Sequence, residues 1–182
     1  FAACRADTKR IVLPESYDTR VVDAANVVVS RGIAEPILLV DSDVPSRLSD
    51  DVIVDHADPD DELIETLVDT RSEMSWQDAE EALDDPIVYA MTLVEAGRAD
   101  GVVCGASHPS KKTYRDALRI IGPRDDVDVV SSVFFMFWHD ALLFFADCAL
   151  NISPSAEELA AIGEETVATA HRFNMSPRVA ML

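Results

Sequence analysis

Short apolar runs alternate along the chain with stretches in which apolar residues recur every three or four positions. Near the start, apolar runs at residues 11–13 and 36–40 flank a stretch whose valines and alanines share one helical stripe. This alternation is typical of β-α-β units, which build parallel sheets covered by helices. The pattern therefore predicts an α/β fold with a mostly parallel sheet and flanking helices.

Capping residues and helix breakers divide the middle of the chain into further elements. Short apolar runs at residues 52–54 and 101–104 predict two more strands. The spacing of apolar residues between and after them predicts four helices, over residues 60–70, 75–83, 86–96 and 113–121.

The apolar runs become longer from Val127 onward. Residues 127–137 and 142–147 predict two strands joined by a polar turn, as in an antiparallel hairpin. A helix capped by Ser155 is expected to run to Phe173, and residues 179–182 predict a final strand. A charged stretch rich in helix breakers precedes Val127, so we expect a first domain over residues 1–126 and an incomplete second one over 127–182.

Charge and cysteine content exclude several classes of function. The chain has 34 acidic and 15 basic residues, for a net charge of −19, and such a field repels nucleic-acid backbones. No apolar run is long enough to span a membrane, so neither nucleic acid nor membrane is expected as a partner. The three cysteines lack metal-ligand spacing, which favours reduced thiols in a cytoplasmic protein without a metal site.

Residues 105–110 form the segment that best suits a ligand. They follow a predicted strand and precede a predicted helix, and they are small or polar. A helix N-terminus attracts anions, and Ser107, His108 and Ser110 add donors while Arg115 follows on the helix. From spacing alone, a plain tight turn is an equal alternative.

Three apolar strings in order, at residues 131–136, 142–149 and 177–182, resemble the phosphate acetyltransferase family. That family moves an acetyl group between coenzyme A and inorganic phosphate. The resemblance extends from the strand-like stretch at residues 9–15 to Leu182. It implies a two-domain architecture like that of isocitrate and isopropylmalate dehydrogenases, truncated in this chain.

The resemblance also implies roles for individual residues. The family has a Gly-Ala-x-His loop followed by Thr-x-Arg, which residues 105–108 and 113–115 match. It implies that Arg115 holds the phosphate end of the substrate, with a guanidinium geometry that suits a phosphoryl group. It further implies a catalytic role for Arg71 and substrate binding by Arg20, Ser107, His108 and Ser110.

Departures from the family pattern also have consequences. Asp116 stands where the family commonly has Pro, and it is expected to pair with Arg115 and weaken the attraction of that cation for an anion. Lys111 and Lys112 replace small or acidic residues, and the basic neighbours usual beside Arg71 are missing. The family's catalytic base falls beyond Leu182, so we expect the chain as given to be inactive and poorly folded by itself.

The implied function is reversible acetyl transfer between acetyl-CoA and phosphate, giving acetyl phosphate and CoA. Acetyl-CoA and CoA would be substrates, with no tightly bound cofactor. The full-length protein could form a homodimer. Two alternatives remain. One is a regulatory, acetyl-CoA-binding domain of a malic enzyme, and the other is a phosphate butyryltransferase.

Overall fold

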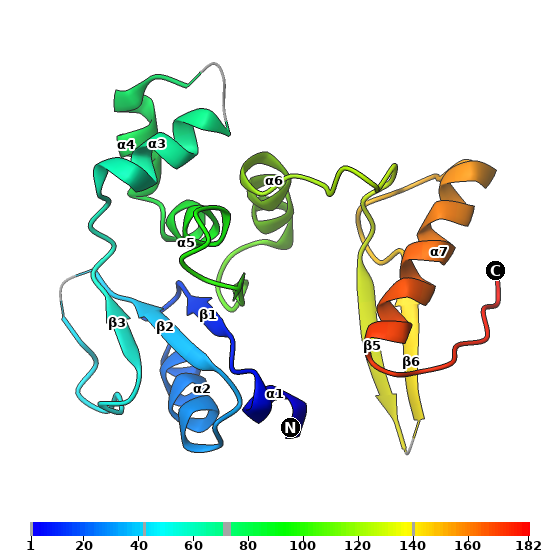
Figure 1. The fold of residues 1–182 in the computed structure, drawn as a ribbon, viewed down its shortest axis with the longest axis horizontal. Helices are drawn as coiled ribbons and strands as arrows, with labels where there is room; N and C mark the ends of the chain where they lie inside the picture. The colour runs from blue at the N-terminus through cyan, green and yellow to red at the C-terminus, as the bar shows by residue number, and fades with distance from the viewer. Residues whose placement is uncertain (1, 42, 71–73, 140) are drawn as a thin grey trace. The chain divides into compact units, whose positions relative to one another are not determined.

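A parallel sheet organises the first of two structural units, Phe1–Gly122, and a hairpin organises the second, Pro123–Leu182. The computed structural model in Figure 1 describes the chain except residues 1, 42, 71–73 and 140. Its strands are β1 (Arg10–Leu13), β2 (Glu35–Leu39), β3 (Ile53–Asp55), β4 (Gly101–Val102), β5 (Val133–Trp138) and β6 (Ala141–Ala146). Its helices are α1 (Ala2–Ala6), α2 (Thr19–Ser30), α3 (Asp61–Asp69), α4 (Trp76–Leu83), α5 (Pro86–Glu95), α6 (Ser110–Ile120) and α7 (Ala156–Arg172).

The sheet of the first unit has the strand order β3-β2-β1-β4, and every pairing is parallel. β1 lies between β2 and β4, so that Ile11 stands opposite Pro36 on one side and Gly101 on the other. The predicted α/β fold with a parallel sheet and flanking helices is thereby confirmed. β4 is shorter than predicted, although the amide of Val103 still donates to Val12 on β1.

Successive residues of the central strands point to opposite faces of this sheet, as the pleat requires. Val12 belongs to a core cluster with α3, α4 and α5, whereas Leu13 belongs to a second cluster with α2. Figure 1 shows α2 and α5 on opposite sides of β1 and β2. Because both faces are covered, these strands read as continuous apolar runs rather than alternating ones.

Short polar side chains fix the starts of α2, α3, α4 and α5 in the first unit. The carboxylate of Asp18 accepts from the amide of Arg20 at the start of α2, and Ser75 accepts from Asp78 at the start of α4. Asp60 and Asp85 do the same for α3 and α5. Such caps satisfy amides that a helix cannot pair internally, so these four helices start within one or two residues of their predicted positions.

The second unit packs its hairpin against α7. β5 and β6 are antiparallel, as predicted, and Phe135, Phe144 and Phe173 form an aromatic cluster, with ring centroids 4.9 Å apart for the first pair. Ser155 and Glu158 form a complete capping box at the start of α7, which confirms that prediction.

Two strand predictions in the second unit are wrong. The first strand begins at Val133 rather than at Val127, because side chains take the backbone groups just before it. Asn151 donates to the carbonyl of Val130, and the amide of Ser132 donates to Asp147. Residues 179–182 form no strand and instead run beside α7, where the sulfur of Met181 approaches Gly163.

One face of the hairpin has no covering layer among the described residues. Phe134 and Trp138 are 55% and 68% exposed, and they lie on the face of the hairpin opposite to Phe135 and Phe144. Met136, Leu143 and Phe145 share this face and are also exposed.

Candidate functional site

The loops that follow β1 and β4 meet at the point where the strand order of the sheet reverses. Strands β1, β2 and β3 are added in one direction, and β4 is then added on the other side of β1. In open α/β sheets, ligands bind outside the carboxyl ends of the strands at such a switch point. The same position holds Arg20, Ser107, His108 and Ser110, which the sequence analysis singled out.

Glu15 lies at the centre of this position and is 1% exposed. Its Oε2 accepts from the amides of Gly105 and Ala106, both at 2.8 Å. Its Oε1 accepts from the amides of Ser107 at 2.7 Å and His108 at 3.1 Å. The loop after β4 is therefore wrapped around a carboxylate supplied by the end of β1.

This arrangement corrects one expectation about the loop. The sequence predicted that residues 105–110 would bind an anionic ligand, but the amides of residues 105–108 bind the carboxylate of Glu15 instead. Burial by itself would raise the pKa of Glu15. Hydrogen bonds from His108 and from the amides of Ser107, Ala106 and Gly105 outweigh burial, and the net effect is a lowered pKa.

His108 contributes its ring as well as its amide to the same carboxylate. Its Nδ1 lies 2.9 Å from Oε1 of Glu15 and 3.2 Å from the hydroxyl of Tyr17. The rings of Tyr17 and His108 meet edge to face, with centroids 6.3 Å apart. Nδ1 of His108 is thus engaged within the loop.

Arg20 is bound by a carboxylate, that of Asp18, and by a backbone carbonyl of the loop, that of Ala106. Its Nε lies 3.0 Å from Oδ1 of Asp18, and its Nη2 donates to the carbonyl of Ala106 at 2.9 Å. Ser107 donates from its hydroxyl to the same Asp18 at 3.1 Å. Arg20 keeps a side-chain exposure of 73%, so its guanidinium is placed by the loop but remains accessible.

Ser110 is the first residue of α6, which begins one turn earlier than the predicted start at Thr113. Pro109 takes the cap position and offers no side-chain hydrogen bond, so the sequence lacks the usual signal for a helix start. Ser110 is exposed at this end of the helix. Arg115 consequently lies in the second turn of α6 and not in the first.

Arg115 is oriented by a neighbouring carboxylate. Its Nε donates to Oδ1 of Asp116 at 2.9 Å, which confirms the pairing expected from the sequence. Among the residues that the structure describes, neither terminal guanidinium nitrogen has a hydrogen-bond partner. The side chain is 59% exposed, whereas that of Asp116 is only 4% exposed.

Lys112 belongs to a charged cluster with Arg115, Asp116 and Asp85 that the sequence analysis did not find. Its Nζ lies 2.7 Å from Oδ2 of Asp116 and 2.7 Å from Oδ2 of Asp85, the cap of α5. Burial acts to raise the pKa of Asp116, but Lys112 and Arg115 outweigh it and the pKa is lowered. The i, i+4 spacing of Lys112 and Asp116 on a helix was the available signal.

Glu15 is the other residue that sequence reasoning missed as part of the site. It was identified only as the end of a strand, and its partners lie about 90 residues later in the chain. Arg71, the second predicted catalytic residue, lies outside the described residues. The contacts of the described residues therefore join Arg20 and the loop, whereas Arg115 lies further along α6 and is bound to Asp116.

In the second unit, Asp147 organises the turn after the hairpin. It accepts from the amide and hydroxyl of Ser132 and from the amides of Leu150 and Asn151. Burial would raise its pKa, but these donors lower it well below the ordinary range. Asp147 is therefore a structural carboxylate that fixes backbone.

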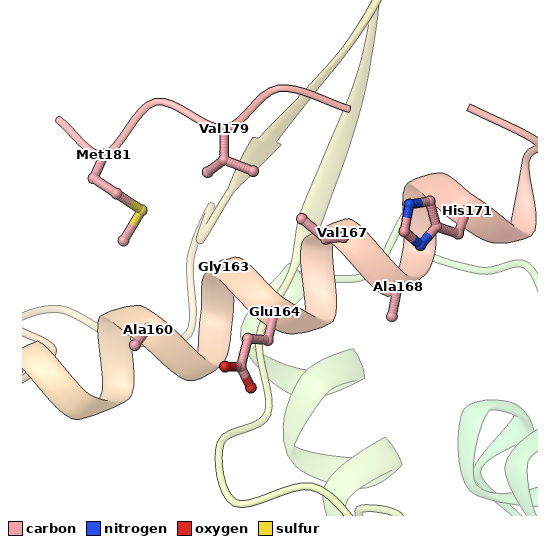
Figure 2. Close-up of a pocket in the computed structure, with 8 residues that line it drawn as sticks. All are labelled: Ala160, Gly163, Glu164, Val167, Ala168, His171, Val179 and Met181. Carbon is pink, nitrogen blue, oxygen red and sulfur yellow. The ribbon is translucent and has the colours of Figure 1, made fainter. Parts of the chain in front are cut away.

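An open groove of about 410 Å³ lies on α7 of the second unit (Figure 2). It is lined by Ala160, Gly163, Glu164, Val167, Ala168, His171, Val179 and Met181. None of the predicted site residues is among them. Over the described ranges of the chain, no cluster of three metal-ligating side chains occurs, and no helix combines the length and apolar character needed to cross a membrane.

Comparison with known proteins gives a consistent result. A family model described as phosphate acetyl/butaryl transferase matches residues 1–182. The chain is 36% identical to a phosphate acetyltransferase from Haemophilus influenzae over 189 residues, covering 98% of this chain and 27% of that protein. It is 37% identical to the one from Nitratidesulfovibrio vulgaris, covering 95% of this chain and 26% of the relative.

Solved structures agree with these relatives. The EutD phosphotransacetylase from Staphylococcus aureus superposes with a TM-score of 0.88 at 32% identity, covering 97% of this chain and 57% of that one. A phosphotransacetylase from Streptococcus pyogenes gives a TM-score of 0.87 at 34% identity, covering 100% and 60%. The chain thus spans about a quarter of the length of the curated relatives described above.

Proposed function

We propose, since this chain belongs to the phosphate acetyl/butaryl transferase family, that its protein transfers an acetyl group reversibly between acetyl-CoA and inorganic phosphate. The observation that carries the proposal is the match of the family model to all of residues 1–182. The products are acetyl phosphate and CoA, and CoA and acetyl-CoA act as substrates rather than as bound cofactors. The curated relatives described above are named for acetyl transfer, which is why acetyl is the acyl group proposed.

In the direction of acetyl-CoA formation, the CoA sulfur forms a bond to the acetyl carbon of acetyl phosphate. The bond from that carbon to the phosphate oxygen then breaks, phosphate leaves, and the thiol proton passes to a base. Negative charge grows on the carbonyl oxygen and the leaving phosphate, so fixed cations lower the barrier. The residues of this chain are assigned to the phosphate end of the reaction.

Arg115 is proposed as the main contact to phosphate. Asp116 holds its Nε, and the two terminal nitrogens, which bind no described residue, can make a bidentate contact to an oxyanion. Arg20, Ser107, His108 and Ser110 are proposed to bind the substrate around it. Arg71 is proposed as a second catalytic arginine with a smaller effect, because it lacks the usual basic neighbours in the sequence.

The test is Arg115→Ala in the protein at its full natural length, assayed for acetyl phosphate formation at varied phosphate. We expect a loss of about 2–4 kcal/mol of transition-state stabilisation, measured as kcat/KM for phosphate. Arg119→Ala is the matched control, because Arg119 is an exposed arginine on the same helix, and its kcat/KM is expected to change less than about threefold. Unchanged kcat and KM in Arg115→Ala would refute the assignment.

Finer parts of the same proposal rest on the family and on the sequence. The family implies an isocitrate/isopropylmalate dehydrogenase-like architecture and a homodimer at full length. The cysteine pattern favours a cytoplasmic location, and the net charge and the short apolar runs argue against a nucleic-acid or membrane partner. Acyl preference separates acetyl transfer from butyryl transfer. A higher kcat/KM with butyryl-CoA than with acetyl-CoA would overturn the acetyl assignment.

A further inference from the structure

The loop at the switch point already contains the anion that its amides bind. Four consecutive backbone donors, from Gly105 to His108, converge on the carboxylate of Glu15 at 2.7–3.1 Å. Gly105 has a φ of 95°, a conformation that L side chains rarely adopt, and this turn aims the successive amides inward. A carboxylate with four charge-assisted bonds in a water-excluded place is held tightly.

The loop in turn places the side chains proposed to meet the substrate. The amide of Ala106 is bound by Glu15, and the carbonyl of the same residue accepts from Nη2 of Arg20. Ser107 is bound by its amide to Glu15 and by its hydroxyl to Asp18, which also pairs with Arg20. The contacts of Glu15 with Ala106, Ser107 and His108 thus lead directly to proposed substrate-binding groups.

We propose that Glu15 is a positioning residue, whose carboxylate fixes Arg20, Ser107 and His108 through the loop after β4. It follows that these four amides are closed to substrate and that the phosphate end is held by side chains instead. This inference rests on the proposed function for the identity of the bound anion. The placement of the loop by Glu15 rests on geometry alone.

The first experiment measures hydrogen exchange in the unaltered full-length protein. Residues 105–107 are exposed, so their amides would exchange quickly if Glu15 did not bind them. We expect the amides of Ala106 and Ser107 to exchange at least about tenfold more slowly than in an unstructured peptide, and phosphate to leave that protection unchanged. Exchange at the rate of a free peptide, or loss of protection on adding phosphate, would overturn the proposal.

The second experiment uses Glu15→Gln. The glutamine amide supplies only one acceptor oxygen, and its NH2 group would face N–H donors of the loop without forming hydrogen bonds to them. We expect KM for phosphate to rise about tenfold with a smaller change in kcat, and the loop amides to lose their protection. Glu35→Gln is the matched control, because Glu35 is an exposed residue at the start of β2. Glu35→Gln is expected to leave KM for phosphate, kcat and the protection of the loop amides unchanged.

A double-mutant cycle separates positioning from a general loss of structure. Because Glu15 acts on substrate partly through Arg20, the effects of Glu15→Gln and Arg20→Ala on KM are expected to be less than additive. Strictly additive effects would refute the proposed route. If the unaltered full-length protein forms no acetyl phosphate, the proposed function itself fails. If Arg115→Ala weakens the phosphate kinetics while Glu15→Gln does not, only the role of Glu15 fails.

If Glu15→Gln does not fold, exchange in the unaltered protein still decides whether the loop is clamped. Ser107→Ala then tests the downstream link, because it removes the hydroxyl contact to Asp18 and keeps the amide bond to Glu15. We expect a rise of about threefold in KM for phosphate, and an unchanged KM would count against the proposed route.

Discussion

Lys112→Met tests how the ion pairs of Lys112 with Asp85 and Asp116 contribute to stability. Lys112 joins two carboxylates, with its Nζ 2.7 Å from Asp85 and 2.7 Å from Asp116. Its side chain is 24% exposed, and that of Asp116 is 4% exposed. Removing the ammonium therefore leaves a buried carboxylate with one of its two cations, while the methionine retains the apolar stem.

The expected loss follows from what each carboxylate keeps. Removing one partner from a buried ion pair costs about 3–5 kcal/mol. Asp116 retains the Nε of Arg115 at 2.9 Å, and Asp85 retains the amide of Ile87 and is itself 35% exposed. These remaining partners and the partial exposure reduce the expected loss to about 2 kcal/mol in the free energy of unfolding.

The measurement uses tryptophan fluorescence to monitor the unfolding of the first unit in urea. The chain has two tryptophans, Trp76 on α4 and Trp138 on the exposed hairpin face, so a Trp138→Phe background makes the signal report on the first unit. Lys111→Met is the matched control, since Lys111 is exposed and has no hydrogen bond to any described residue. It should change the free energy by less than about 0.5 kcal/mol.

Two results would refute this reasoning. Equal losses for Lys112→Met and Lys111→Met would mean that the contacts of Lys112 add nothing specific. A loss below about 0.5 kcal/mol for Lys112→Met would mean that solvent or Arg115 compensates both carboxylates fully.

Two further predictions concern the core and the acid range. Leu63→Ala should cost about 3 kcal/mol in unfolding free energy because Leu63 is 0% exposed, whereas Leu118→Ala, at 43% exposure, should cost less than about 1 kcal/mol; equal losses in urea titrations would contradict this. The pKa of Glu15 lies below its ordinary value of 4.5, so its stabilising contribution is present above pH 4.5 and is lost as pH falls through the lowered pKa. Stability should therefore fall less steeply below pH 4.5 in Glu15→Gln than in the unaltered protein, and parallel urea midpoints against pH would show that Glu15 contributes nothing.

Much of the fold of the first unit could be predicted because its signals are local. β1 and β2 are short apolar runs buried on both faces, and polar caps such as Asp18 and Ser75 mark where helices begin. The start of α6 was missed for the opposite reason, since Pro109 makes no side-chain cap. In the second unit, residues 127–132 have a strand-like composition, but Asp147 and Asn151 take backbone groups that a ladder would need.

The site divides in the same way between local and distant contacts. The pairing of Arg115 with Asp116 was predicted because the two residues are adjacent in sequence. The binding of Glu15 by the loop was not, because it depends on β4 lying beside β1, a neighbourhood that the order of elements along the chain does not reveal. A carboxylate directly after a buried strand was the available sign, since such a group must find donors when it is covered.

The way in which Glu15 is bound also determines which positions can drift over evolution. The carboxylate is bound by main-chain groups, so Ala106 can be replaced by any residue other than proline without removing a donor to it. Gly105, at its positive φ, and Glu15 have no such freedom. A mutational scan of this region should therefore find its least tolerant positions at Gly105 and Glu15, and greater tolerance at Ala106.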